Sequence, residues 1–548
     1  MIIDFDNAPG GVRRKRLQTW PLARGGAAHV PQFLGTSAAI SRWAGLRAAI
    51  PLWFLLSALS GCVVHRTPIT AREMEAQRAA DVQEIRHAQP LPQGPVTLHQ
   101  AMARALLYNY DQKLALMQQA LALKQADLAN YAMLPLVVAD AAYIRRNKFN
   151  AASSRSLLTG QESLQLSTSE DRSRVVSDLT LSWNILDFGV SYQQAHQQAD
   201  LALAAQEARR MAIDTVTQQV RSAYWQAVAA ERIGPKVSAA IERVSAALKD
   251  SQSVERDGVG DRLTALAYQR TLLDTLGQLQ VQRRQIDQQR IQLAILMGLP
   301  PESDFSIATD RESPPVEHPQ ALAAVESLEE FALVNRPETR QEAYLKRVSA
   351  AETRIALLKI LPGLNFIGAL KSDSNQYLRN HHWATSAAQV SWNLVSLVSG
   401  PAAISSAKAA AEVGHTRRLA VSMAIMMQVR MAVLAYRDAL SSYQAATDLS
   451  TVDHRIFAQT QIMAAARRAA AKEVVAAELN DILSSLKRDL AYADLQSAVA
   501  SIFLSVGADP LPSTVGTTDI DAIASALDSN EAKWLSGEFY QKPDHIGG

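Results

Sequence analysis

The stretch DLTLSWNILDFG, residues 178–189, changes its hydrophobic period in the middle. Apolar Leu179, Leu181 and Trp183 alternate with polar residues, which is the two-residue period of a β-strand with one apolar face. After Gly189 the apolar residues recur with helical spacing over a very long segment. The stretch therefore predicts a strand that passes directly into a long helix.

The same pattern occurs a second time, 209 positions further along the chain. Three features share this offset, namely SWN at 182–184 and 391–393, QVR at 219–221 and 428–430, and glycine at 298 and 507. Upstream, Asn109 aligns with Asn335 at an offset of 226, and Pro135 aligns with Pro362 at an offset of 227. The change of offset predicts two copies of one unit, with about 18 extra residues in a Ser/Thr-rich loop at 150–170.

Each copy is predicted to contain a helix, two strands and a long helical hairpin. The helices at 98–132 and 328–360 both end at Leu-Pro, because proline cannot continue a helix. In the first copy the hairpin is predicted to run from Ser191 to Lys249 and back from Leu263 to Met297. Gly234-Pro235 interrupts the outward helix, where we expect a kink.

Two strands per copy give four strands, and four strands cannot close into a barrel. A membrane sheet with open edges would leave backbone groups unpaired in hydrocarbon, so a barrel must be shared between chains. A half-buried sheet of a soluble protein would show the same alternation, and that alternative stays open. Trp183 and Trp392 are candidates either for an aromatic girdle at the membrane interface or for a core.

The only cysteine, Cys62, follows the apolar stretch LWFLLSALSG at 52–61. Basic residues, a short apolar segment and small residues occur in the order of a secretory signal. Leu59-Ser60-Gly61-Cys62 resembles a bacterial lipobox, which makes Cys62 a candidate for lipid attachment rather than a buried core residue. The preceding 61 residues exceed the usual 15–30 of a signal, so either the leader is long or translation starts downstream. No uninterrupted apolar run long enough for a transmembrane helix follows.

Composition and motifs argue against several other functions. Net charge is +2 with acidic and basic residues interspersed, which does not favour nucleic-acid binding despite RRKR at 13–16. No zinc-protease, P-loop or nucleophile-elbow motif is present, so no enzyme, cofactor or metal is expected. His381-His382 is an adjacent pair without a third ligand, which is more typical of an exposed polar loop than of a metal site.

The order of these elements after a lipobox resembles the TolC-like outer-membrane efflux proteins, in their lipid-anchored branch. The resemblance implies a mainly α fold with a membrane β-barrel portion, in which a homotrimer shares one twelve-stranded barrel and a helical tunnel. It implies no catalysis, an inner-membrane pump and a periplasmic adaptor as partners, and an outer-membrane location with a periplasmic extension. A lipid-anchored periplasmic coiled coil without a pore remains the alternative.

The resemblance also assigns residues. Asp187, Phe188 and Gly189 match the strand-to-helix corner of the family. The hairpin tip that family members present to the adaptor is matched by a glycine-containing segment whose candidate residues are Gly258, Val259, Asp261, Leu263 and Leu266. The second tip departs from the family because it has no glycine and carries Arg467, Arg468 and Lys472. These three residues either form a basic ring at the periplasmic mouth, which would favour anions, or are an ordinary solvated charge run.

The expected domain organisation follows from these assignments. The segments are a leader at 1–61, an anchored segment at 62–95, the first repeat at 96–304, a linker at 305–326, the second repeat at 327–512 and a polar tail at 513–548. The expected function is the exit duct of a tripartite efflux or secretion system. The cargo cannot be inferred from the sequence, because the pump that feeds such a duct selects it.

Overall fold

The computed structural model describes residues 67–87, 89–163, 165–257, 261–308, 325–510 and 518–537. The chain divides into two compact units, Met1–Ala76 and Gln77–Gly548. Helix α2 (Ala71–His87) begins in the first unit and ends in the second. It follows Thr70, whose backbone N–H and hydroxyl both donate to Glu73 Oε2, at 2.8 and 2.9 Å. The leader and Cys62 lie outside the described residues.

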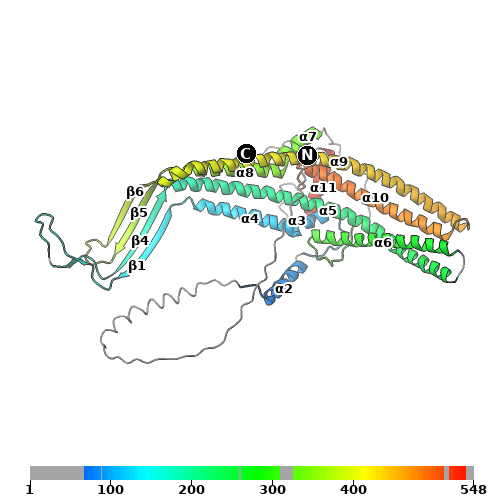
Figure 1. Cartoon of the computed structure of the whole chain (residues 1–548), viewed down its shortest axis with the longest axis horizontal. Coiled ribbons are helices and arrows are strands. Elements are labelled where there is room, and N and C mark those ends of the chain that lie inside the picture. The colour runs from blue at the N-terminus through cyan, green and yellow to red at the C-terminus, as the bar shows by residue number, and fades with distance from the viewer. Residues whose placement is uncertain are drawn as a thin grey trace, which may run out of the picture. The chain divides into compact units, whose positions relative to one another are not determined.

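The second unit contains two copies of one element series (Figure 1). The first copy consists of α3 (Leu98–Tyr108), α4 (Tyr110–Tyr131), β1 (Leu136–Arg145), β4 (Ser173–Asn184), α5 (Ile185–Arg256) and α6 (Arg262–Leu296). The second consists of α7 (Val325–Asn335), α8 (Pro337–Leu358), β5 (Gly363–Asp373), β6 (His382–Ser391), α9 (Leu394–Ala465) and α10 (Ala471–Val506). The predicted mainly α repeat architecture is thereby confirmed.

The element bounds refine the predicted alignment of the two copies. The starts of α3 and α7, of α4 and α8, and of β1 and β5 are each 227 positions apart, so Asn109 corresponds to Arg336 and not to Asn335. The starts of α5 and α9 are 209 positions apart. The extra residues therefore lie between β1 and β4, where the expected loop contains a short antiparallel pair, β2 (Ala151–Ala152) with β3 (Ser167–Thr168).

The first predicted helix of each copy is two helices, which corrects the expectation of one. In the first copy the Asn109 side chain accepts hydrogen bonds from the backbone N–H groups of Asp111 and Gln112, at 2.9 and 3.2 Å. An asparagine that caps these donors starts a new helix. In the second copy Pro337 occupies the first turn of α8 and produces the same break after Arg336.

The long helices begin earlier than the sequence predicted. The Asn184 side chain accepts from Leu186 N at 2.9 Å, so α5 starts at Ile185 rather than at Ser191. Asn393 accepts from Val395 N at 3.1 Å in the second copy. The SWN motif thus combines the last strand residues with a helix cap. Pro235 lies inside α5, which continues through it as one helix of 72 residues.

The four predicted strands form one antiparallel sheet, and the structure gives their order as β1-β4-β5-β6. The first copy supplies β1 and β4, and the second supplies β5 and β6. The outer strands β1 and β6 each pair on one side only in the described part of the chain. The sheet therefore ends in two open edges.

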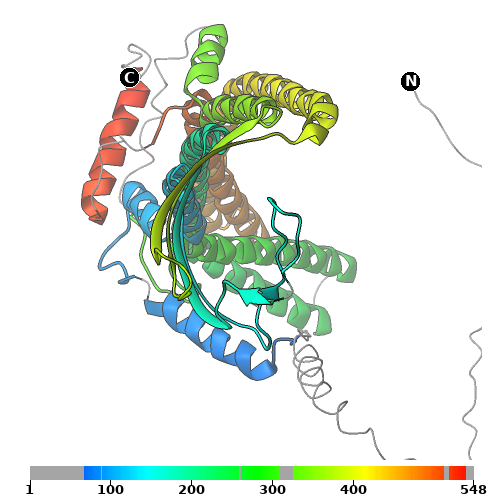
Figure 2. The same ribbon diagram turned by 90° about the vertical axis from the view of Figure 1, so that its left-hand side faces the viewer.

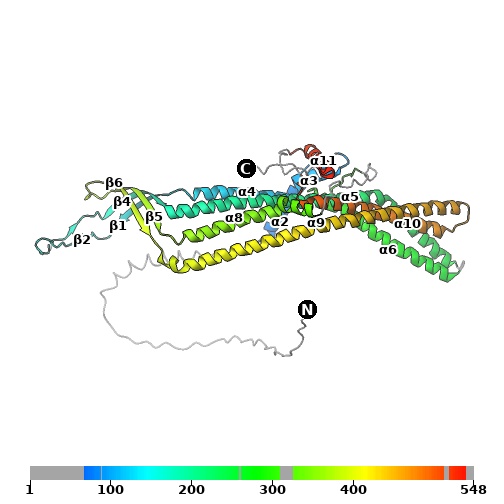
Figure 3. The same ribbon diagram turned by 90° about the horizontal axis from the view of Figure 1, so that it is seen from above.

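The helices form a wall that continues from the sheet (Figures 1 and 3). Near the sheet the contacts run in the order α4, α5, α8, α9, and toward the hairpin ends they run α6, α5, α10, α9. By length and composition α9 could cross a membrane, because an 18-residue segment of it has a mean hydropathy of 1.6. This finding qualifies the expectation that no such segment follows the leader. In the wall, α9 packs against α8 and α10.

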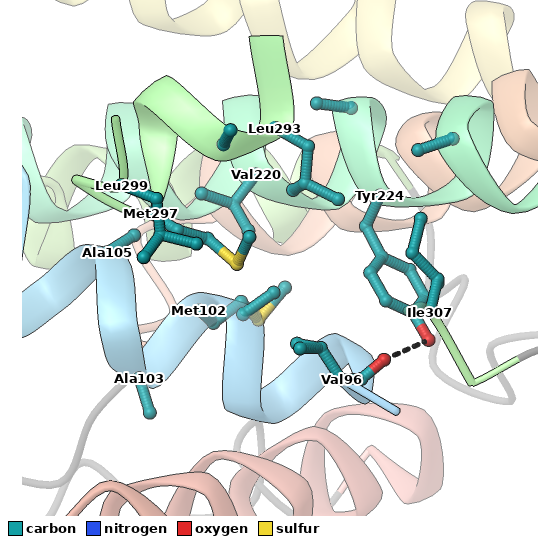
Figure 4. Close-up of a cluster of buried hydrophobic side chains, with 14 of the residues drawn as sticks. Val96, Met102, Ala103, Ala105, Val220, Tyr224, Leu293, Met297, Leu299 and Ile307 are labelled. Carbon is teal, nitrogen blue, oxygen red and sulfur yellow. Dashed lines mark hydrogen bonds between the residues drawn. The ribbon is translucent and has the colours of Figure 1, made fainter. Parts of the chain in front are cut away.

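A buried cluster joins α3, α5 and the end of α6 in the middle of the unit (Figure 4). Tyr224 donates from its hydroxyl to Val96 O at 3.3 Å, and Val96 N donates to Ser306 O at 2.9 Å. Phe305 and Ile307, which the sequence analysis placed in the linker, are buried in this cluster. They extend the first repeat past the predicted boundary at residue 304.

Two glycines, one at the end of each helical hairpin, allow the chain to pack closely against the break between the first two helices of the same copy. Gly298 and Gly507 both have a left-handed φ, of +75° and +80°. A Cβ at Gly298 would lie 2.7 Å from Tyr108 O, and a Cβ at Gly507 would lie 2.8 Å from Arg336 N. Both the conformation and the close approach require glycine. Their recurrence in the sequence thus has a packing cause.

The expected polar tail contains a packed helix, α11 (Ile520–Ser536). It contacts α3, and its Trp534 stacks on Phe503 with ring centroids 5.4 Å apart. Glu531 of this helix accepts from Arg221 at 2.6 Å and pairs with His99 Nε2 at 2.7 Å. Helix α11 therefore connects the first copy with the core of the second.

Candidate functional site

The two faces of the sheet differ in polarity. Residues opposite one another in neighbouring strands share a face. Leu181 lies opposite Val137 and Gly368, and Trp183 lies opposite Phe366, so one face is apolar. On the other face a charged row crosses three strands, with Asp178 opposite both Asp140 and Lys371. Ser182 also donates there to Asn365 Oδ1 at 3.0 Å.

Along β4 the apolar face is the more exposed of the two. Leu179 and Leu181 expose 45 % and 43 % of their surface, whereas Asp178 and Thr180 between them are half-buried. Figure 2 shows the sheet as a curved arc. Side chains crowd on the concave face of such an arc and spread on the convex face. The burial pattern of β4 therefore places the polar residues on the concave side.

Both candidate interface tryptophans lie next to the long helices, with Trp183 near the end of β4 and Trp392 directly after β6. Trp183 is 39 % exposed and meets Phe188 edge to face with ring centroids 5.9 Å apart. Trp392 is 49 % exposed, and its indole N–H donates to Ile360 O at 3.0 Å. An apolar ring with its polar group satisfied is typical of an interfacial aromatic.

The predicted corner residues lie in the first turn of α5 and not in a loop before it. Asp187 is at the amino end of the helix, where its carboxylate interacts favourably with the helix dipole. Phe188 stacks on Tyr192 at 6.4 Å, and Gly189 faces Leu358 of α8 across ordinary contact distance. The corner itself is made by Asn184.

The first hairpin tip presents a capped helix start with exposed leucines. Asp261 accepts from Leu263 N and Thr264 N, at 3.3 and 3.0 Å, and from the Thr264 hydroxyl at 2.6 Å. The hydroxyl bond, followed by the backbone bonds, lowers the pKa of Asp261. Leu263 and Leu266 are 75 % and 43 % exposed. Gly258 and Val259 lie outside the described residues.

The second tip closes without glycine. Arg468 N donates to Met463 O at 2.8 Å and Arg467 N to Ala464 O at 2.9 Å, which is the Schellman pattern of a helix end. Arg467 adopts the left-handed conformation, with φ 57°, and both arginines are exposed. Lys472 lies in the first turn of α10. The predicted basic residues are thus brought to one tip.

At the opposite end of the unit, a polar network connects the outer loops of the two copies. Arg174 donates to Asp373 Oδ2 at 2.7 Å. The buried Asn375 accepts from Asp171 N at 3.0 Å and donates to Ser169 O at 2.9 Å. His381 Nδ1 contacts Asp373 O at 3.1 Å. Among the residues that the structure describes, no group of three or more histidine, cysteine or acidic side chains could hold a metal ion.

Comparison with known proteins identifies the fold. No protein-family model and no curated protein matches the chain. Solved structures do match it, and the outer-membrane channel OprN shares 18 % identity over 75 % of this chain and 89 % of that chain, with a TM-score of 0.58. The chain has the TolC-like fold.

Two further structures extend the TolC-like match. The CmeC outer-membrane channel of Campylobacter jejuni shares 14 % identity over 79 % of this chain and 89 % of that chain, with a TM-score of 0.60. The outer-membrane protein VceC of Vibrio cholerae shares 12 % identity over 75 % of this chain and 96 % of that chain, with a TM-score of 0.55. At these identities the likeness is one of fold.

Sequence reasoning missed the Glu531 cluster and helix α11. A signal for the helix was available, because Ile520, Ile523, Ala524 and Leu527 recur with helical spacing after the capping residue Asp519. The pairing of Glu531 with Arg221 and His99 had no signal, since these residues are hundreds of positions apart in the sequence.

Proposed function

We propose that this chain forms the outer-membrane exit duct of a tripartite export system, as a homotrimer. The observation that carries the proposal is the wall with two open edges and two unlike faces. Strands β1 and β6 leave backbone groups unpaired at opposite ends of the sheet. In hydrocarbon each such group costs several kcal/mol, so a membrane sheet must close.

Closure between chains explains the two different edges. When β6 of one copy pairs with β1 of the next, the contact is heterologous, and such contacts form rings when the rotation closes. Three copies give twelve strands, with the convex apolar face toward lipid and the concave polar face toward water. This arrangement is that of a transmembrane barrel with a polar interior.

The helical layer supports the same ring. At its sheet-proximal end the outer helices are α4 and α9. Helix α4 exposes an apolar stripe at Leu114, Met117, Leu121 and Leu128, and α9 exposes one at Met423, Met427, Met431 and Leu434. Both stripes have the 3–4-residue spacing of helix contacts. The α4 stripe lies nearer the sheet than the α9 stripe, because α4 corresponds to α8 and Gln428 of α9 contacts Arg336 just before α8. A neighbouring copy that continues the barrel as a tunnel would cover both stripes.

The remaining parts of the chain fit the partners of such a duct. The exposed leucines of the first tip offer a contact for a periplasmic adaptor, and the adaptor would connect the duct to an inner-membrane pump. Lipid attached to Cys62 would add a second hold on the outer membrane, where one acyl chain alone binds weakly. The duct itself carries out no catalysis and uses no cofactor. A coiled coil without a pore would not need the curved sheet with segregated faces.

Reconstitution tests the channel. The purified chain should produce discrete conductance steps in a planar bilayer and should migrate as a heat-dissociable trimer on an unheated gel. If natively extracted protein shows neither conductance steps nor a heat-dissociable trimer, the proposal is wrong. Copurification after cross-linking in cells should recover an adaptor and a pump.

The anchor is tested separately. Metabolic labelling with a fatty acid should mark the wild-type chain and not Cys62→Ser, and the mature chain should begin at residue 62. A mature chain that begins elsewhere contradicts the anchor alone. The Cys62→Ser chain should still conduct, since the barrel holds it in the membrane.

A further inference from the structure

The inserted loop of the first copy is a built hairpin rather than an open coil. Beyond β2 and β3, Ser163 N donates to Ser154 O at 2.8 Å and Ser156 N to Gln161 O at 2.9 Å. Gly160 closes the terminal turn, with φ +71° and its N–H donating to Ser156 O at 2.9 Å. Arg155 Nε also donates to Gly160 O at 2.8 Å. The hairpin therefore holds its terminal turn in one conformation.

Two leucines occupy the crest of this turn. Leu157 and Leu158 are 102 % and 98 % exposed, the highest values among the exposed large apolar residues of the described chain. Burial of a leucine side chain is worth about 1.5–3 kcal/mol, which both residues forgo in the isolated chain. Turns ordinarily carry polar residues or glycine. An ordered turn that displays two adjacent leucines is therefore suited to an apolar contact.

The base of the hairpin is attached to the rim of the sheet. Asn150 Nδ2 donates to Glu170 Oε2 at 2.9 Å. The Glu170 carboxylate also forms ion pairs with the guanidinium groups of Arg146 and Arg174, each with an N–O distance of 3.7 Å. Arg174 also forms an ion pair with Asp373 of the second copy. These contacts fix the direction in which the hairpin leaves the sheet. In Figure 2 the hairpin that carries β2 and β3 lies on the concave side of the arc.

We propose that Leu157 and Leu158 of each copy contact the same residues of the other copies above the pore axis. The occupant of this apolar surface is thus the hairpin tip of a second copy of this chain, and together the tips form an apolar constriction at the outer mouth. Apolar constrictions restrict water and ions by dewetting. This inference rests on the proposed ring, because the concave side faces the pore only after closure.

The dimensions allow the contact. Twelve strands at about 4.8 Å spacing and about 40° tilt enclose a radius of about 12 Å. The eleven residue steps from Arg146 to Leu157 reach up to about 36 Å when extended. The second copy lacks the insertion, so the ring holds one such hairpin per copy. Cyclic symmetry then brings identical tips together at the axis.

Cysteine cross-linking tests the contact in the full-length chain. Leu158→Cys, treated as the native trimer with a short bismaleimide, should give a covalent dimer at several times the yield of Lys148→Cys, which lies at the exposed base of the hairpin. Leu157→Cys provides a second variant at the crest. The wild type treated with the same bismaleimide controls for any reaction of Cys62.

The outcomes separate this inference from the proposed function. A chain that forms no trimer on an unheated gel and gives no conductance overturns both. A trimer in which neither crest variant cross-links above the Lys148→Cys level overturns only the contact between tips. If a fluorescent label at Leu158→Cys is instead strongly quenched by brominated lipid in vesicles, the occupant is the membrane and the proposal is wrong.

Discussion

Asp214 is a partly buried carboxylate with an unsatisfied oxygen. It lies on α5, and its Oδ1 atom is buried without a hydrogen-bond partner. Burial, with Asp509 and Glu338 adding repulsion against the attraction of Arg210 and Arg336, raises its pKa from 3.8 to about 7. The folded chain therefore holds a proton between pH 4 and pH 7 that the unfolded chain releases. Because the native state binds more protons there, this residue lowers stability as pH rises through that range.

Replacing Asp214 by asparagine should remove that pH dependence. Asp214→Asn should raise the melting temperature more at pH 8 than at pH 5. The difference between the two pH values is worth up to about 2.6 kcal/mol, because about two pKa units of the shift act between pH 5 and pH 7, at 1.36 kcal/mol per unit. Thermal unfolding of the detergent-solubilised protein at the two pH values measures it. Asp127→Asn, at an exposed residue paired with Lys124, is the control and should change little. Equal shifts at both pH values would show that Asp214 is ionised throughout.

Arg467 stores backbone strain at the second tip. A non-glycine residue in the left-handed region costs about 1–2 kcal/mol, which glycine avoids. Arg467→Gly should therefore stabilise the hairpin by about 1 kcal/mol and make the α9–α10 turn more resistant to proteolysis. Arg468→Gly is the matched control, since it removes the same charge at a residue without positive φ and should not stabilise. If Arg467→Gly raises stability and also reduces transport, the charge of Arg467 contributes to transport at the periplasmic mouth.

At the scale of elements, α11 supplies the first copy with an acidic partner for an arginine of α5, whereas the second copy takes the equivalent acidic partner from its own helix α7. Arg221 and Arg430 are equivalent residues of the QVR motif. Arg430 pairs with Glu329 of α7, whereas the residue that corresponds to Glu329 in α3 is Met102. Arg221 is instead paired by Glu531 of α11. Burial alone would raise the pKa of Glu531, but Arg221 and His99 outweigh it and hold the pKa well below its ordinary range.

Loss of the Glu531 charge should loosen α11. Glu531→Gln leaves Arg221, whose side chain is 5 % exposed, as an uncompensated charge. Breaking one partner of a buried pair costs about 3–5 kcal/mol. We expect a lower melting temperature and faster proteolytic loss of the C-terminal segment. Asp528→Asn, at a residue 74 % exposed that also faces His99, should cost under about 1 kcal/mol. A Glu531→Gln chain as stable as Asp528→Asn would contradict the role given to this pair.

The elements also show which features a sequence can predict. The strands, the repeat and the long hairpins were predictable because each rests on local periodicity or on a recurring offset. The break at Asn109 was missed because helical spacing continues across it, although the capping pattern of Asn109 was a usable signal. The contacts of Glu531 and the network at Asn375 were out of reach, because they join residues that are far apart in the sequence.

At the scale of the whole molecule, each open edge of the helical wall carries an exposed apolar stripe. The leucines of α4 and the methionines of α9 are unremarkable in the sequence, where helical spacing alone predicts burial. Only the order of helices in the wall reveals that these two stripes lie at opposite edges. Methionine suits the α9 stripe because its flexible thioether adapts to an irregular partner surface. A ring gives each stripe a partner without any change within the chain.

A photo-cross-linking amino acid placed at an edge should therefore capture a neighbour. Introduced at Leu121 of α4, benzoylphenylalanine should yield covalent dimers and trimers, and mass spectrometry should map the partner peptide to α9, residues 394–465. The matched control is Leu357 of α8, which is 49 % exposed but lies on a helix flanked by α5 and α9 within the chain. Capture there should stay within one chain. Because the ring requires α4 to meet α9 of the next copy, cross-links from Leu121 to another α4 would indicate a two-fold pairing of chains. A two-fold contact uses the same surface on both partners and cannot join unlike edges, so that result would exclude the proposed duct.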